Sequence, residues 1–171
     1  MRLDTHWYKL SLKLMNAPKI DLLNQTEHTN CPSLSDFTQW VDATCQYLTM
    51  TLAKKLPKGE LTFVIIDTAT MTNLNQEFRH KSGPTNVLSF PDQPHPGLTE
   101  YGFGDVVFCF DVMQQEAQEQ HKPLQEHFAH LTIHGVLHLL GYDHCDDASA
   151  NAMETLEANI LNTLHITNPY Q

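Results

Sequence analysis

The sequence predicts an α/β (α+β) fold in which a small central sheet is packed with about five helices. Segments with helical periodicity alternate along the chain with short β-branched segments of strand length. One helix, residues 123–140, is apolar on nearly all sides, so it should be buried. The chain has 171 residues, the size of one domain with a sizeable core. We therefore expect one domain over residues 19–171, preceded by an N-terminal extension, residues 1–18.

The first expected elements are a short strand and a long helix. Residues 8–14 alternate weakly, which favours a strand, although Met15 is an alternative start of the protein. Ser33 and Ser35 are both good N-cap residues for a helix with apolar residues at helical spacing. We expect this helix to continue into Ala53.

The middle of the chain predicts two strands around a short helix. LTFVIID, residues 61–67, is a β-branched apolar run of strand length. Residues 70–80 predict a helix that buries Leu74 and Phe78. Residues 86–90 are then extended, and the proline that follows ends this strand.

The last part of the chain predicts one strand and three helices. FGDVVFCF, residues 103–110, is a second strongly strand-like run. Asp111 can cap the next helix, which should reach Gln120. Pro123 is well placed in the first turn of the buried helix, and a final helix covers residues 148–164.

The net charge restricts how this chain could bind nucleic acid. Twenty acidic residues against ten basic ones give a formal charge of -10, which disfavours binding of long nucleic acid through a broad basic face. An enzyme acting on nucleic acid would need a locally positive cleft or a partner that presents the substrate. The candidate cations are Lys54, Lys55, Lys58, Arg79 and Lys81.

Composition also predicts the compartment. No apolar run approaches the roughly 20 residues needed to span a bilayer, and no signal-peptide core can be drawn. The four cysteines are scattered and form no C-x-x-C pair, which favours reduced thiols. We therefore expect a cytoplasmic protein with no membrane partner.

HLTIHGVLHLLGYDHCDD, residues 130–147, has the spacing of a metal site. His134 and His138 lie four residues apart on one helix face, so both rings can bind one ion. Gly141 can end the helix in a left-handed conformation, and His144 can then return as the third ligand. Three protein ligands leave a fourth position open, as in catalytic zinc sites. We predict one zinc ion at these three histidines, with other divalent transition metals as alternatives.

A histidine pair alone is weak support for a metal site, because this chain has 11 histidines. His130 and His134 form a rival pair, but no third ligand is well placed for them. We therefore expect His130 to support the ligands or to lie in the core.

The residue after the first ligand bears on the reaction. In H-E-x-x-H peptidases a glutamate at this position takes a proton from water, whereas this chain has Gly135. Peptide hydrolysis by that route is therefore disfavoured, and the site needs groups that stabilise developing negative charge. Arg79 and Lys81 are candidates, because a guanidinium pairs with phosphate oxygens; the alternative is that both are solvated charges at a helix end.

Three other polar residues each have two interpretations. Asp143, next to the third ligand, is a candidate to orient that ligand or move a proton, or it is a turn residue. Ser89 is a candidate donor to a substrate phosphate, or it bonds locally. Asp105 follows a glycine in an apolar strand, where a buried carboxylate would require partners.

Three ordered motifs resemble a known family. They are HGVLHLLGYDH at residues 134–144, FRHKSGPTNVLSFP at residues 78–91, and the Gly-Asp pair at residues 104–105. Together they are similar to the YbeY family of bacterial endoribonucleases, also called rRNA maturation factors. The resemblance extends from Ile20 to the last helix.

The resemblance implies a metal-dependent endoribonuclease that prefers single-stranded RNA. It implies roles in maturing the 3′ end of 16S ribosomal RNA and in quality control of defective ribosomes, with the small ribosomal subunit and ribosome-associated proteins as partners. The implied fold is α/β with a small mixed sheet and a metal cleft, usually assigned to zinc. The family's ligand histidines carry over to His134, His138 and His144, and its functional arginine to Arg79.

Two other functions stay open. One is a metzincin-like metallopeptidase, which the histidine spacing favours and Gly135 opposes. The other is a ribosome-assembly factor without catalysis, in which the metal stabilises the fold.

Overall fold

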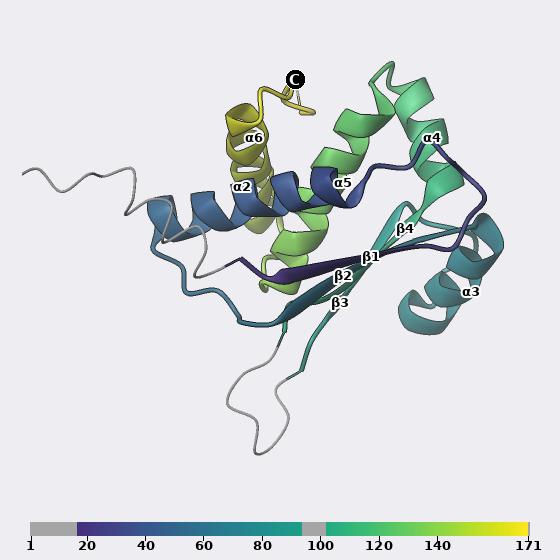
Figure 1. Ribbon diagram of the computed structural model, residues 1–171, viewed down its shortest axis with the longest axis horizontal. Helices are drawn as coiled ribbons and strands as arrows, with labels where there is room; N and C mark the ends of the chain where they lie inside the picture. Colours follow the sequence, from purple (N-terminus) through teal and green to yellow (C-terminus); the bar gives the residue numbers. More distant parts are fainter. Residues whose placement is uncertain (1–16, 94–101, 171) are drawn as a thin grey trace, which may run out of the picture.

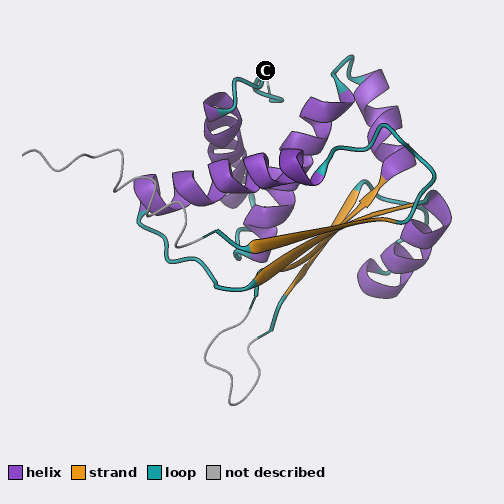
Figure 2. Cartoon of the chain, in the orientation of Figure 1, coloured by secondary structure: helices purple, strands orange, loops and turns teal. Residues whose placement is uncertain are grey.

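The computed structural model describes residues 17–93 and 102–170, so the strand expected at residues 8–14 lies outside the described residues. The described residues form four strands and five helices (Figures 1 and 2). The strands are β1 (Lys19–Asn24), β2 (Glu60–Ile66), β3 (Val87–Pro91) and β4 (Gly104–Cys109). The helices are α2 (Leu34–Leu52), α3 (Thr68–Arg79), α4 (Phe110–Glu119), α5 (Leu124–Leu139) and α6 (Asp147–Thr163). Of these five helices, none combines the length and apolar character that crossing a membrane requires.

The four strands form one mixed sheet in the order β1-β2-β4-β3. β1, β2 and β4 are parallel, and β3 runs antiparallel to β4 at one edge. Parallel neighbours need long crossover connections, which here contain α2 in one case and α3 with β3 in the other. The predicted α/β fold and the mixed sheet implied by the family resemblance are therefore confirmed.

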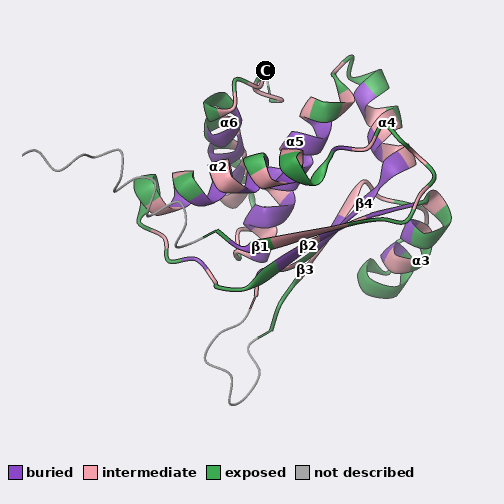
Figure 3. Cartoon of the chain, in the orientation of Figure 1, coloured by how far each residue is buried: buried purple, intermediate pink, exposed green. Residues whose placement is uncertain are grey.

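Helices cover both faces of the sheet. α2, α4, α5 and α6 lie on one face, and α3 lies on the other (Figure 1). The larger core lies beneath α2 and α5, where Phe37, Phe63 and Phe108 pack ring against ring. The smaller core, beneath α3, consists of Ile66, Met71, Leu88, Val107 and Cys109. Most residues of α5 are buried, as predicted for this helix (Figure 3).

The first helix begins as its sequence predicts. The hydroxyl of Ser33 accepts a hydrogen bond from the backbone of Asp36, and the Asp36 carboxylate accepts one from the backbone of Ser33. This reciprocal arrangement satisfies two backbone N–H groups that have no partner within the helix. Ser33 is therefore the cap of α2, and Ala53 lies just past its end.

Two predictions about the sheet and its cover were wrong. β1 was missed, because KIDLLN mixes charged and apolar residues and only its middle is half-buried at the sheet edge. Phe78 was expected in the core but is 53% exposed. The buried residues of α3 are Met71 and Asn75, and the Phe78 ring instead packs edge-on against Phe90 at 5.0 Å between centroids.

Two aspartates also differ from expectation. Asp111 does not cap α4, since the N-cap residue is Cys109, whose side chain makes no capping hydrogen bond. The Asp111 carboxylate instead accepts from the Thr68 hydroxyl at 2.7 Å and lies 3.2 Å from His28 Nε2, which ties α4 to α3 and to the loop after β1. Asp105 is exposed at the start of β4, so it needs no buried partner.

Candidate metal centre

Three histidines converge at the C-terminal end of α5. His134 and His138 come from successive turns of α5, and His144 comes from the loop that follows it. The Nε2 atoms of His134 and His138 lie 3.1 Å apart, and one nitrogen from each of the three rings lies within 4.8 Å of the others. The structure thus brings together the three residues proposed as ligands.

After α5 ends, a turn at Gly141 brings the chain back to this cluster. Gly141 has a φ of 84°, the left-handed conformation expected for it, and its N–H donates to the carbonyl of His138 at 3.0 Å. Lys54 donates from Nζ to the carbonyl of Leu140 at 3.0 Å and lies 4.2 Å from the centre of the Tyr142 ring. Lys54, a candidate cation for nucleic acid, is therefore engaged at the end of α5.

Asp143 shapes the loop that carries the third histidine. One carboxylate oxygen accepts the backbone N–H of His144 at 2.8 Å, and the other accepts the Cys145 thiol at 2.7 Å. These two hydrogen bonds hold the pKa of Asp143 below its usual range. Asp143 is thus an exposed carboxylate, ionised at neutral pH, beside the third histidine.

Glu157 of α6 was not predicted as a site residue, although it contacts the cluster directly. Its side chain is 1% exposed, and its two oxygens lie 2.8 Å from His134 Nδ1 and 2.9 Å from His130 Nε2. Burial alone would raise the pKa of Glu157, but the hydrogen bonds from His130 and His134 outweigh it and lower the pKa to about 2. A sequence signal was present, because Glu157 lies at helical spacing from Met153 and Ile160 on the buried stripe of α6.

The donor set fits a divalent transition metal. Imidazole nitrogen is a common ligand of zinc and its neighbours in the first transition row. Burial, together with the nearby His134 and His144 rings, lowers the pKa of His138, which favours the neutral ring that a ligand must have. Two ring nitrogens that face each other at 3.1 Å need a proton or a cation between them.

Gly135 faces the sheet, where there is no space for a side chain. A Cβ atom at residue 135 would lie 2.8 Å from Val106 Cγ1 and 3.2 Å from Ser89 Oγ. The Ser89 hydroxyl also donates to the carbonyl of Gly135 at 3.2 Å. The absence of the peptidase glutamate therefore has a packing cause, the close approach of α5 to β3 and β4.

The proposed phosphate-binding residues lie apart from the histidines. Arg79 is the last residue of α3, on the opposite face of the sheet from α5, and Lys81 lies two residues further along the chain; both are exposed. Within residues 17–93 and 102–170, no hydrogen bond or ion pair joins Arg79 or Lys81 to the three histidines. The structure therefore groups Asp143 with the histidines, places Ser89 against the same helix, and leaves the two cations separate.

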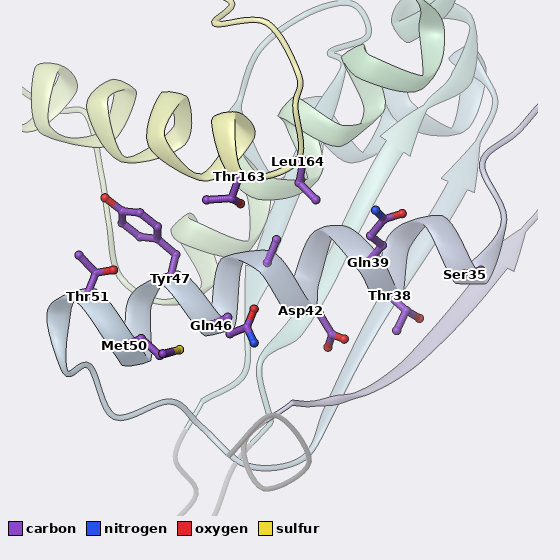
Figure 4. A pocket seen from close by; sticks show the side chains of 11 residues that line it. Ser35, Thr38, Gln39, Asp42, Gln46, Tyr47, Met50, Thr51, Thr163 and Leu164 are labelled. Carbon is purple, nitrogen blue, oxygen red and sulfur yellow. The ribbon is translucent and has the colours of Figure 1, made fainter. Parts of the chain in front are cut away.

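A groove elsewhere on the surface offers different chemistry. It has a volume of about 690 Å³ and lies between α2 and the end of α6 (Figure 4). Its lining residues include Gln39, Tyr47, Met50 and Thr163, with no histidine, cysteine, lysine or arginine. The groove therefore presents one carboxylate, Asp42, and no phosphate-binding cation.

Comparison with known proteins is consistent with these features. The family model described as Endoribonuclease YbeY matches residues 19–165. Proteins named Endoribonuclease YbeY from two strains of Coxiella burnetii, Dugway 5J108-111 and RSA 331 / Henzerling II, are each 46% identical over 152 residues, covering 89% of this chain and 97% of the relative. The solution structure of TM1509 from Thermotoga maritima is similar with a TM-score of 0.49 and 20% identity, over 85% of this chain and 91% of that one.

The family match covers most of the chain, and its residues include all three histidines of the cluster. The chain therefore belongs to the YbeY family of endoribonucleases, hydrolases that act on RNA.

Proposed function

We propose that this protein is a metal-dependent endoribonuclease that cuts single-stranded RNA. The observation that carries the proposal is the histidine cluster, in a chain that belongs to an endoribonuclease family. His134, His138 and His144 would hold one zinc ion or another divalent transition metal. When bound, the metal supplies Lewis-acid chemistry at the phosphodiester and makes water more acidic.

The protein side chains divide the remaining tasks. Arg79 and Lys81 are proposed to bind phosphate oxygens of the RNA strand, and Arg79 also to stabilise charge that develops during cleavage. Because both lie apart from the histidines, the second role requires RNA binding to bring the end of α3 and the histidine cluster together. Asp143 is proposed to accept a proton near the reacting phosphate, since it is an exposed carboxylate beside His144. Ser89 is proposed to donate to phosphate; its hydroxyl now donates to Gly135, so it would have to exchange that partner.

The biological substrate is proposed to be ribosomal RNA. The formal charge of -10 disfavours tight binding of free RNA, so a ribosomal particle that presents the strand would supply contacts that the protein lacks. We infer 3′-end maturation of 16S rRNA and quality control of ribosomes in the cytoplasm, with the small subunit and ribosome-associated proteins as partners. The functional domain would be residues 19–171.

One preparation of protein tests the proposal in two measurements. Bound metal is determined by mass spectrometry, and cleavage is followed on a fluorescent single-stranded RNA with a duplex RNA and casein as comparison substrates. The native protein should contain about one metal ion per chain and cut only the single strand. His138→Ala should lose both metal and cleavage, whereas Arg79→Ala should keep the metal and lose cleavage.

Three results would contradict the proposal. Cleavage that persists in His138→Ala would point to a contaminating ribonuclease or to a different site. Casein hydrolysis without RNA cleavage would favour the metallopeptidase. Full complementation of a deletion strain by His138→Ala and by Arg79→Ala would favour an assembly factor without catalysis.

A further inference from the structure

We propose that Glu157 is the positioning residue of the metal centre, and that Tyr170 and His130 hold its carboxylate in place. This inference rests on the proposed function, because it assumes that the three histidines bind a metal. It adds to the metal centre Glu157, a residue of α6, and Tyr170, a residue of the segment that follows α6.

The geometry around Glu157 is that of a carboxylate that receives hydrogen bonds on both oxygens. Oε1 lies 2.8 Å from His134 Nδ1, and Oε2 lies 2.9 Å from His130 Nε2. The Tyr170 hydroxyl also donates to Oε2. A carboxylate that is 1% exposed is costly unless its oxygens are satisfied, and three donors satisfy them here.

The contact with Glu157 decides which ring nitrogen of His134 carries the lone pair that a metal ion needs. A neutral imidazole carries its hydrogen on one nitrogen and a lone pair on the other, and a carboxylate acceptor selects the hydrogen on the nearer one. The hydrogen of His134 therefore lies on Nδ1, toward Glu157. The lone pair lies on Nε2, which faces His138 Nε2 at 3.1 Å.

Tyr170 and His130 keep the carboxylate from rotating away. His130 lies one turn before His134 on α5, and its ring meets the Tyr170 ring edge-on at 5.5 Å between centroids. Tyr170 reaches Glu157 from the segment after α6, so residues well beyond the ligand motif complete the surroundings of His134. The series of contacts is Tyr170 to Glu157 to His134.

Zinc affinity of the full chain, measured by competition with a chromophoric chelator, tests this role. Glu157→Gln should bind zinc about 10- to 100-fold more weakly than the native protein, the usual effect of losing such a carboxylate. Glu119→Gln is the matched control, since Glu119 is exposed on α4 and the change in charge is the same; its affinity should be unchanged. Nitrogen-15 NMR of the metal-free proteins should show His134 protonated at Nδ1 in the native chain and in a mixture of tautomers in Glu157→Gln.

Tyr170→Phe is the second variant, because it removes only the hydroxyl of a partly exposed residue and should fold even if Glu157→Gln does not. It should weaken zinc binding less than Glu157→Gln does.

Native zinc affinity in Glu157→Gln would overturn the inference and leave the proposed function intact. Where Glu157→Gln is unfolded, native zinc affinity in Tyr170→Phe would do the same. Failure of the native chain itself to bind zinc would instead reject the metal centre of the proposed function, and this inference with it. Zinc at saturating concentration should restore RNA cleavage to Glu157→Gln, and a persistent loss would show that Glu157 acts in the reaction instead of positioning His134.

Discussion

Gly135 of α5 packs so closely against Val106 of β4 that a Cβ atom at residue 135 would lie 2.8 Å from Val106 Cγ1. Gly135→Ala should therefore destabilise the fold. Overpacking costs about 1–3 kcal/mol, whereas the better helix propensity of alanine returns only about 1 kcal/mol. Urea denaturation measures the difference in the free energy of unfolding.

Val106→Ala supplies the control for this prediction, because it removes the atom that the new Cβ would meet. The double variant should lose less stability than the sum of the two single variants, which is the sign of direct contact. Simple additivity would show that Gly135 is needed for another reason. Gly135→Glu should be less stable still and should gain no peptidase activity on casein.

Zinc should stabilise the protein through the three histidines. A ligand that binds only the folded state at 100 times its Kd adds about 2.7 kcal/mol to the free energy of unfolding. Zinc at that excess should therefore raise the Tm of the native protein, and a chelator should reverse the rise. His138→Ala should show no zinc-dependent shift, and a shift of native size in that variant would exclude His138 as a ligand.

The metal-free protein should lose stability in mild acid because of His138. Burial and the neighbouring His134 and His144 rings lower its folded pKa below the unfolded value of about 6.5. The unfolded chain therefore binds more protons in this range, so this contribution to stability is full above about pH 6.5 and is lost as the pH falls below it. Chemical denaturation between pH 5 and pH 8 in chelator measures the slope, which His138→Gln should reduce; an unchanged slope would assign the effect to other groups.

Glu116 should be important for stability although it lies outside the metal cluster. Its carboxylate accepts from Asn86 Nδ2 at 3.1 Å and lies 2.8 Å from Nε2 of the buried His127. Glu116→Ala would leave His127 without this partner and should cost about 1–3 kcal/mol. Glu119→Ala, an exposed change on the same helix, should cost less than about 0.5 kcal/mol. Equal losses in the two variants would show that the contacts of Glu116 with Asn86 and His127 do not stabilise the fold.

Two phenylalanines test the correction of the predicted core. Phe78 is 53% exposed, whereas Phe128 of α5 is fully buried. Phe128→Ala should cost about 3–5 kcal/mol in denaturation experiments, and Phe78→Ala should cost roughly 1 kcal/mol. A comparable loss for Phe78→Ala would mean that this ring is covered in solution.

Periodicity predicted most elements of the fold. The helices at α2 and α6 have apolar residues at helical spacing, and α5 is apolar on nearly all sides over 16 residues. β2 and β4 each contain a continuous apolar run, so the types of these elements were clear from the sequence. β1 has no such run, because an edge strand that is half-exposed needs few apolar residues. Strand order and direction depend on which strands meet in space, and the residues alone left that undetermined.

The candidate site likewise has features that local spacing in the sequence predicts and features that depend on tertiary packing. The convergence of His134 and His138 follows from one turn of helix, and Gly141 indicated how the chain could return to them. Helical spacing could have placed Glu157 on the buried stripe of α6, but its partner His134 is 23 residues away on another helix, so no local pattern identified the contact. The packing of Gly135 on Val106 likewise depends on how α5 lies on the sheet, which no local pattern in the sequence reveals.

The strand order also determines how this chain can reach its folded state. Lys19 pairs with Glu60, and Leu61 pairs with Gly104, so both parallel contacts join residues roughly forty positions apart. Each pairing must close a long loop, at a cost in chain entropy, before the hydrogen bonds between the two strands can form. Folding should therefore take milliseconds to seconds, slower than in a helical bundle of this length, and the transition state should already contain α2 packed on the face of the paired strands β1 and β2.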